Sequence, residues 1–170
     1  MTFYALSSGS GISGISVIRV SGTETKNVIL SLTNGPLPKP RVATVKKINK
    51  INTNELIDEG IIIWFPGPQS YTGEDMAEFH VHGSKAVIDA IHESISKVEN
   101  CRLAEPGEFT KIAFQNGKIN LLKAESIADL ISSETELQRQ QAIKIMSGKS
   151  SEKFNSIREK LLKILTNVEA

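Results

Sequence analysis

The sequence predicts an α+β fold, in which a mixed-sheet α/β domain over residues 1–118 is followed by an all-helical segment over residues 119–170. Up to Lys118, runs rich in β-branched residues alternate with amphipathic helical patterns, and several connections are too short for parallel crossovers. After Lys118, the apolar residues recur only at helical spacing. We therefore expect strands and helices in the first domain and helices alone in the second.

The composition limits the classes of protein to which the chain can belong. With 170 residues, 39% of them hydrophobic and 23% charged, it is typical of a soluble globular protein. No apolar run approaches the roughly eighteen residues of a membrane helix, so we expect a chain that does not span a bilayer. The N-terminus resembles neither a secretory signal nor a mitochondrial presequence. The single Cys101 excludes an intramolecular disulfide and is interpreted as a core residue. The net charge is only +1, so the chain lacks the large excess of positive charge that is typical of proteins that bind a nucleic acid duplex.

Three glycines near the N-terminus, Gly9, Gly11 and Gly14, form the pattern G-x-G-x-x-G. In a dinucleotide site this pattern follows a strand and opens a helix, whose N-terminus binds the phosphates. Here the glycines lie between residues 3–6 and residues 15–20, both of which predict strands. A loop between two strands offers no helix N-terminus. We therefore interpret the glycines as a tight backbone connection.

The next elements are predicted from caps, turn residues and apolar runs. Thr23 is the expected N-cap of a helix that ends at residues 34–36, Asn-Gly-Pro. Strands are expected over residues 42–48 and 60–65, and the second, an unbroken apolar run, has the pattern of a strand buried on both faces. Residues 66–73 hold two prolines and two glycines, which predicts a loop.

The strand expected over residues 76–82 carries the most informative polar groups. Because side chains alternate along a strand, Glu78, His80 and His82 face one way and the apolar side chains face the other. A carboxylate and two imidazoles on one face are a possible metal arrangement. No further histidine cluster or cysteine pair completes it, so we favour a hydrogen-bonded polar face and assign no metal.

Arg19 lies near the end of the otherwise apolar strand expected over residues 15–20. Burying an unpaired guanidinium costs on the order of several kcal/mol, so this side chain needs acceptors. The favoured interpretation is structural: Arg19 pairs with an acidic residue of a neighbouring strand. Two functional alternatives stay open, in which Arg19 binds a ligand carboxylate or orients an acidic residue that binds the ligand.

Helical patterns dominate after the polar strand. We expect a helix from Ser84 to about residue 100, a short strand over residues 101–103, and a helix from Pro106 to residues 116–117, Asn-Gly. These elements complete the first domain.

In the second domain, Asn120 is the expected cap of the first helix, and residues 133–136 have the pattern of a capping box that starts another. Residues 147–150 end in Gly-Lys-Ser, but Ile143 stands where a phosphate loop needs glycine, so we predict a helix interruption. The last helix has an apolar seam of two heptads, too short for a coiled coil alone, and needs partner helices from a second copy or from a further part of the protein. The seam comprises Phe154, Ile157, Leu161, Ile164 and Val168.

Three separated segments in the chain resemble the MnmE (TrmE) family of tRNA-modification GTPases. They are GISVIRVSG (residues 14–22), FPGPQSYTGEDMAEFHVHGS (65–84) and LAEPGEFTKIAFQNGKINLLKAESIADLI (103–131). The resemblance implies an N-terminal α/β domain similar to the tetrahydrofolate-binding domain of aminomethyltransferases, followed by a helical domain into which a G domain is inserted. In the first loop, the family's Gly-Arg-Gly is replaced here by Gly-Ile-Ser at residues 11–13.

The resemblance also implies an assembly. Members of the family are homodimers through the N-terminal domain, and with the flavoprotein MnmG (GidA) they modify the wobble uridine of certain tRNAs. GTP, magnesium and potassium bind in the G domain, which residues 1–170 do not include. We therefore expect this chain to be an N-terminal portion from the bacterial cytoplasm, with no membrane partner, that does not itself hydrolyse GTP.

The family's folate site corresponds to Arg19, Glu78 and Lys118 in this chain. The resemblance implies 5-formyltetrahydrofolate or 5,10-methylenetetrahydrofolate as the ligand. We assign Glu78 to the amide-like edge of the pterin, Arg19 to Glu78 or to the ligand directly, and Lys118 to the acidic tail. The alternative is a non-enzymatic dimerisation scaffold with a weak folate pocket.

Overall fold

The computed structural model describes residues 1–169, without the side chains of residues 149–153 and 169. Within it, the chain divides into two compact units, residues 1–118 and residues 119–170. Among the described residues, no helix has the length and apolar character that a membrane span requires.

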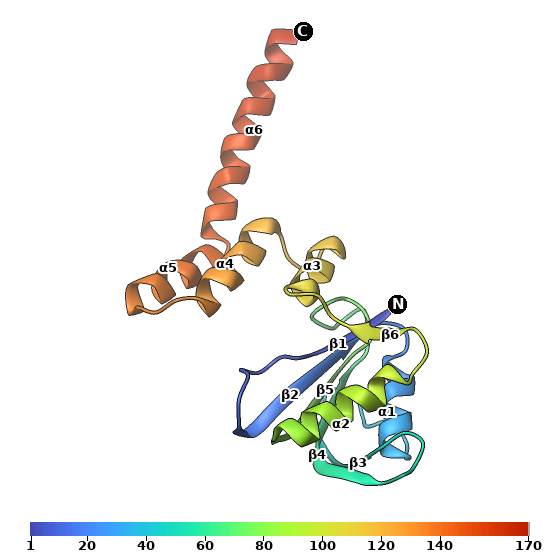
Figure 1. The fold of residues 1–170 in the computed structure, drawn as a ribbon. Coiled ribbons are helices and arrows are strands. Elements are labelled where there is room, and N and C mark those ends of the chain that lie inside the picture. The colour runs from blue at the N-terminus through green and yellow to red at the C-terminus, as the bar shows by residue number, and fades with distance from the viewer. Residues whose placement is uncertain (170) are drawn as a thin grey trace. The chain divides into compact units, whose positions relative to one another are not determined.

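The first unit is built on a six-stranded sheet with the order β3-β4-β5-β2-β1-β6 (Figure 1). The neighbouring strands are antiparallel, except that β1 and β6 are parallel. This mixture confirms the predicted mixed sheet, and the antiparallel β1 and β2 confirm the strand–loop–strand interpretation of the glycines. The strands are β1 (Thr2–Leu6), β2 (Ser13–Ser21), β3 (Thr44–Asn49), β4 (Leu56–Phe65), β5 (Met76–Gly83) and β6 (Cys101–Leu103).

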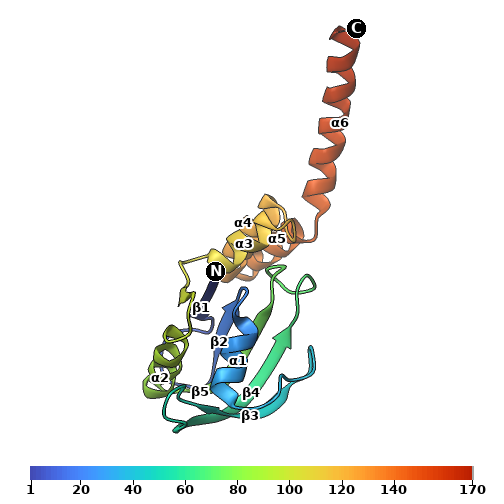
Figure 2. The same ribbon diagram turned by 90° about the vertical axis from the view of Figure 1, so that its right-hand side faces the viewer.

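Two helices, α1 (Thr25–Thr33) and α2 (Lys85–Ser96), cover one face of this sheet (Figure 2). Their apolar sides and alternate strand residues form a single hydrophobic core, in which Phe79 and Ile62 are fully buried. A third helix, α3 (Glu108–Gln115), contacts the other face near one end, because the Phe109 ring lies 4.8 Å from the ring of Phe3. We call this face, which α3 contacts only near one end, the open face.

Two predictions about these elements are wrong. Glu24 rather than Thr23 is the N-cap of α1, and no side chain caps this helix; instead the Glu24 N–H donates to Thr2 Oγ1 at 2.7 Å. The apolar run in β4 is not buried on both faces: Ile62 is fully buried, whereas Ile61 is 40% exposed. The physical reason is that α1 and α2 lie against one side of the sheet only.

The second unit contains α4 (Leu121–Ile131), α5 (Glu136–Met146) and α6 (Lys149–Glu169). Asn120 caps α4 by accepting from the Lys123 N–H, as predicted. The capping box of α5 lies two residues later than expected, between Thr135 and Gln138, because the Ser133 hydroxyl donates to the Leu130 carbonyl. Gly148, with φ of +88°, separates α5 from α6 and confirms the predicted interruption.

Candidate functional site

Arg19 and Glu78 form the centre of the polar groups on the open face. They are direct partners in the antiparallel register of β2 and β5. Glu78 Oε1 accepts hydrogen bonds from Arg19 Nη2 at 2.7 Å and from Arg19 Nε at 3.1 Å. The two side chains are 28% and 16% exposed, so the pair is largely shielded but still reaches solvent. This confirms the predicted pairing of Arg19 with an acidic residue of a neighbouring strand.

Two aromatic rings hold the guanidinium of Arg19 from outside the sheet. Its Cζ atom lies 5.5 Å from the ring centroid of Phe109 in α3 and 5.8 Å from that of Tyr71. These distances are within the range of a cation–π attraction. Neither aromatic residue was predicted as a site residue, because their contact with Arg19 arises only from the tertiary packing.

Residues 66–75, which we call the proline loop, carry Tyr71 and connect β4 to β5. The loop is anchored to α3 and to the segment after it. The Tyr71 hydroxyl lies 3.0 Å from the Thr110 hydroxyl, and the Asn116 amide donates to the Thr72 carbonyl at 2.8 Å. The loop is also tied to β2, because the Thr72 hydroxyl lies 2.7 Å from that of Ser21.

Lys118 contacts the same loop. Its ammonium group donates a hydrogen bond to the Pro68 carbonyl at 2.8 Å. Its methylenes lie against Gly73, where an added Cβ would come within 3.4 Å of Lys118 Cγ and Cδ. The structure therefore joins Arg19 to Glu78 directly, and connects Lys118 to them through the loop whose Tyr71 contacts Arg19.

The remaining polar residues of β5 are hydrogen bonded, as the alternation along the strand predicts. His80 Nε2 lies 3.4 Å from Glu78 Oε2. Asp58 accepts from the His82 backbone N–H at 2.8 Å, and its other oxygen lies 2.8 Å from His82 Nδ1. Burial opposes ionisation of Asp58, but the hydrogen bonds from His82 and from the Glu59 N–H hold its pKa below the usual value. Among the described residues, no three His, Cys, Asp or Glu side chains are grouped so that they could hold a metal ion.

The start of α3 is fixed by an ion pair that also positions Phe109. Arg102 donates to both oxygens of the buried Glu108, one of these bonds being 2.9 Å long, and the Glu105 N–H donates to the same carboxylate at 2.8 Å. The Arg102 hydrogen bonds lower the pKa of Glu108 against the opposing effect of burial, and the Glu105 N–H adds to them. Elsewhere in the unit, burial raises the pKa of Cys101 to about 11, and this residue packs against the core as predicted.

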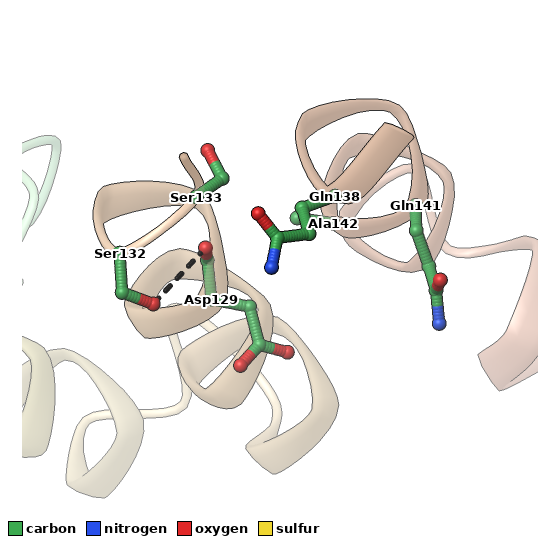
Figure 3. Close-up of a pocket in the computed structure, with 6 residues that line it drawn as sticks. All are labelled: Asp129, Ser132, Ser133, Gln138, Gln141 and Ala142. Carbon is green, nitrogen blue, oxygen red and sulfur yellow. Dashed lines mark hydrogen bonds between the residues drawn. The ribbon is translucent and has the colours of Figure 1, made fainter. Parts of the chain in front are cut away.

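A separate polar pocket of about 220 Å³ lies between α4 and α5 in the helical unit (Figure 3). Its two serine hydroxyls donate to backbone carbonyls of α4, and the Gln138 side-chain oxygen accepts from the start of α5. The sequence pattern did not predict this pocket, and these three side-chain oxygens serve the helix ends. The lining residues are Asp129, Ser132, Ser133, Gln138, Gln141 and Ala142.

These observations define an α/β domain with a polar cluster on an open sheet face, joined to a helical segment. Comparisons with known proteins agree with that class. The chain matches the family model described as "GTP-binding protein TrmE N-terminus" over residues 2–118, and the one described as "MnmE helical domain" over residues 121–170. The chain belongs to the MnmE (TrmE) family, which confirms the resemblance seen in its motifs.

Curated relatives show the same relationship along the full chain. It is 79% identical over 170 residues to a tRNA modification GTPase MnmE from Pelagibacter ubique (strain HTCC1062), of which it covers 38%. It is 45% identical over 170 residues to the mitochondrial 5-taurinomethyluridine-[tRNA] synthase subunit GTPB3 of Homo sapiens, of which it covers 35%. The chain thus spans little more than a third of the length of these relatives.

Proposed function

We propose that residues 1–118 bind a reduced folate, 5-formyltetrahydrofolate or 5,10-methylenetetrahydrofolate, through Arg19, Glu78 and Lys118. The folate is the one-carbon source within a protein that modifies the wobble uridine of tRNA. The observation that carries this proposal is the Arg19–Glu78 pair on the open face. A carboxylate fixed by a guanidinium, at the edge of a half-exposed cluster of aromatic rings, suits a flat heterocycle.

The two oxygens of Glu78 have different partners, and this difference supports its assignment to the pterin. Oε1 accepts both hydrogen bonds from Arg19, whereas Oε2 lies at the longer distance of 3.4 Å from His80 Nε2. A pterin presents a ring N–H beside an amino group, which is a planar pair of donors that matches a carboxylate. Arg19 then acts as the residue that orients Glu78.

Lys118 supplies the positive charge for the glutamyl tail of the folate. In the structure its ammonium donates to the neutral carbonyl of Pro68. A carboxylate forms a stronger, charge-assisted hydrogen bond with an ammonium group than a carbonyl does. The tail therefore competes favourably with Pro68 for Lys118.

The open face supports a homodimer through the N-terminal domain. Antiparallel sheets often leave one face to water, but here that face carries exposed apolar side chains: Ile15 is 68%, Val45 63% and Ile61 40% exposed. A hollow of about 200 Å³ with Ile15, Ile61 and His80 in its lining lies on the same face. A second copy of the chain can cover this surface without a separate complementary partner, because in a twofold dimer both copies contribute the same patch.

The other functions belong to the whole protein and are proposed from the family. The flavoprotein MnmG (GidA) and tRNA are the partners, and GTP, magnesium and potassium bind in a G domain outside residues 1–170. The bacterial cytoplasm is the proposed location. The second candidate function, a dimerisation scaffold with a weak folate pocket, is favoured by Ile12, which is 96% exposed where the family has arginine.

Isothermal titration of the 170-residue chain with 5-formyltetrahydrofolate tests the proposal. We expect saturable binding that Glu78→Gln weakens by about tenfold or more, because a hydrogen bond to a charged group contributes about 1.5–3 kcal/mol. The matched control is Glu93→Gln, since Glu93 pairs with Lys97 on the surface of α2. Unchanged binding by Glu78→Gln contradicts the assignment, and a wild-type chain that takes up no folate favours the scaffold.

A further inference from the structure

We propose that Tyr71 is a positioning residue of this site, which holds the Arg19 guanidinium on Glu78 and is itself held by Thr110. This inference rests on the proposed folate site and extends it to a residue in a loop. The contacts form a continuous series. The Thr110 hydroxyl lies 3.0 Å from the Tyr71 hydroxyl, and the centroid of the Tyr71 ring lies 5.8 Å from Arg19 Cζ. Arg19 Nη2 in turn lies 2.7 Å from Glu78 Oε1.

The side chain of an arginine has considerable conformational freedom. The backbone register places Arg19 and Glu78 opposite each other, but a long side chain on an open sheet face has several rotamers that reach water. Arg19 is still 28% exposed in the structure, so the strands alone do not immobilise it. The rings of Tyr71 and Phe109 restrict the guanidinium from outside the sheet.

The two rings are held in place in different ways. Phe109 is part of a helix and packs on Phe3, so its position follows from the fold. Tyr71 is in the proline loop, and its hydroxyl contact with Thr110 links that loop to α3. Removing either hydroxyl leaves the Tyr71 ring attached to the loop but no longer held against α3.

The proline loop links the residues at the two ends of the proposed folate site. Tyr71 contacts Arg19, while Pro68 of the same loop accepts the hydrogen bond from Lys118. When Lys118 binds the folate tail, its hydrogen bond to Pro68 is lost. The hydrogen bond between Tyr71 and Thr110 then contributes more to holding the loop in place. Tyr71 therefore affects the pterin end of the site, and Lys118 affects the tail end.

The test compares Tyr71→Leu, Tyr71→Phe and Thr110→Val in titrations with 5-formyltetrahydrofolate and with 5-formyltetrahydropteroate, which lacks the glutamate. We expect Tyr71→Leu to weaken both ligands by about tenfold, since a partly shielded cation–π contact has that magnitude. Tyr71→Phe and Thr110→Val each reduce the affinity for both ligands by about threefold. The double variant binds no more weakly than either single variant, because the same hydrogen bond is lost in all three. Lys118→Ala weakens only the ligand that has a tail.

The control is Tyr4→Phe, which removes a tyrosine hydroxyl from the same domain. Tyr4 donates to the His92 carbonyl on the helix-covered side of the sheet, away from Arg19. A loss of affinity in Tyr4→Phe that equals the loss in Tyr71→Phe overturns the proposal, because it indicates general destabilisation. Unchanged affinity in Tyr71→Leu also overturns it.

A measurement without folate separates this inference from the proposed function. In nuclear magnetic resonance spectra, a hydrogen-bonded Arg19 Nε–H gives a signal that exchanges slowly with water. We expect the signal in the wild type and in Tyr4→Phe, and its loss in Tyr71→Leu and in Glu78→Gln. A signal that persists in Tyr71→Leu refutes the positioning role, whereas a wild type with the signal but without folate binding refutes the proposed function alone.

Discussion

Arg19 and Glu78 face each other across the ladder of β2 and β5, and two nitrogens of the guanidinium donate to the same carboxylate oxygen at 2.7 and 3.1 Å. The second oxygen of Glu78, Oε2, lies 3.4 Å from His80 Nε2. The two oxygens of Glu78 therefore have different partners.

The first prediction tests the shape of the Arg19 side chain. A lysine keeps the positive charge but has no planar guanidinium that can direct two N–H groups at the same carboxylate oxygen. We expect Arg19→Lys to reduce affinity for 5-formyltetrahydrofolate by about tenfold in isothermal titration. Arg139→Lys, in an exposed pair with Glu136 on α5, is the control and leaves the affinity unchanged. Equal affinity of Arg19→Lys and wild type contradicts the two-bond role.

The second prediction concerns acid stability. Folding lowers the pKa of Glu108, chiefly through the Arg102 hydrogen bonds. A carboxylate of this kind stabilises the folded state above its unfolded pKa, about 4.3, and that contribution is lost as the pH falls through the lower, folded pKa. In urea unfolding from pH 7 to pH 3, we expect the wild type to lose more stability below about pH 5 than Glu108→Gln does. Parallel curves for the two proteins refute the assignment.

The third prediction tests the open face as a dimer surface. Sedimentation velocity of the wild-type chain at micromolar concentration is expected to show a dimer or a larger species. A charge at Val45 or Ile61 must be desolvated in such an interface, so Val45→Glu and Ile61→Glu shift the distribution to monomer. Leu30→Glu is the control, because Leu30 is 39% exposed on α1, on the covered side of the sheet. A strictly monomeric wild type contradicts the prediction.

The fourth prediction concerns the core between the sheet and its two helices. Phe79 is fully buried, and Phe79→Ala leaves a cavity that costs about 3–5 kcal/mol of the free energy of unfolding. Phe114→Ala, at a residue that is 44% exposed on α3, changes it by no more than about 0.5 kcal/mol. Urea denaturation measures both values, and a similar loss in the two variants means that the core is wrongly assigned.

Some of the site could be predicted from the sequence because it depends on local periodicity. The alternation in residues 76–82 is sufficient to place Glu78, His80 and His82 on one face. The need of a half-buried guanidinium for an acceptor predicts that Arg19 pairs with an acidic side chain. The identity of that partner as Glu78 follows from the resemblance to the family, since a strand pattern does not contain its register with another strand.

Other features depend on which surfaces meet, and the sequence pattern alone does not specify them. The apolar run of β4 matches a strand buried on both faces, but both covering helices lie on one side of the sheet. Thr23 has a side chain that often caps helices. In the structure, however, the hydroxyl of Thr2, which is distant in sequence, accepts the hydrogen bond from the Glu24 N–H at the start of α1. Tyr71 and Phe109 were missed for the same reason, because only tertiary packing brings them to Arg19.

The most direct measurement of the central claim is a crystal structure of the 170-residue chain with 5-formyltetrahydrofolate. We expect the pterin at Glu78, with ring and amino nitrogens within hydrogen-bond distance of the carboxylate, and Lys118 moved from the Pro68 carbonyl to the glutamate of the ligand. A folate bound away from β2 and β5, or one that leaves Glu78 without a ligand contact, contradicts it.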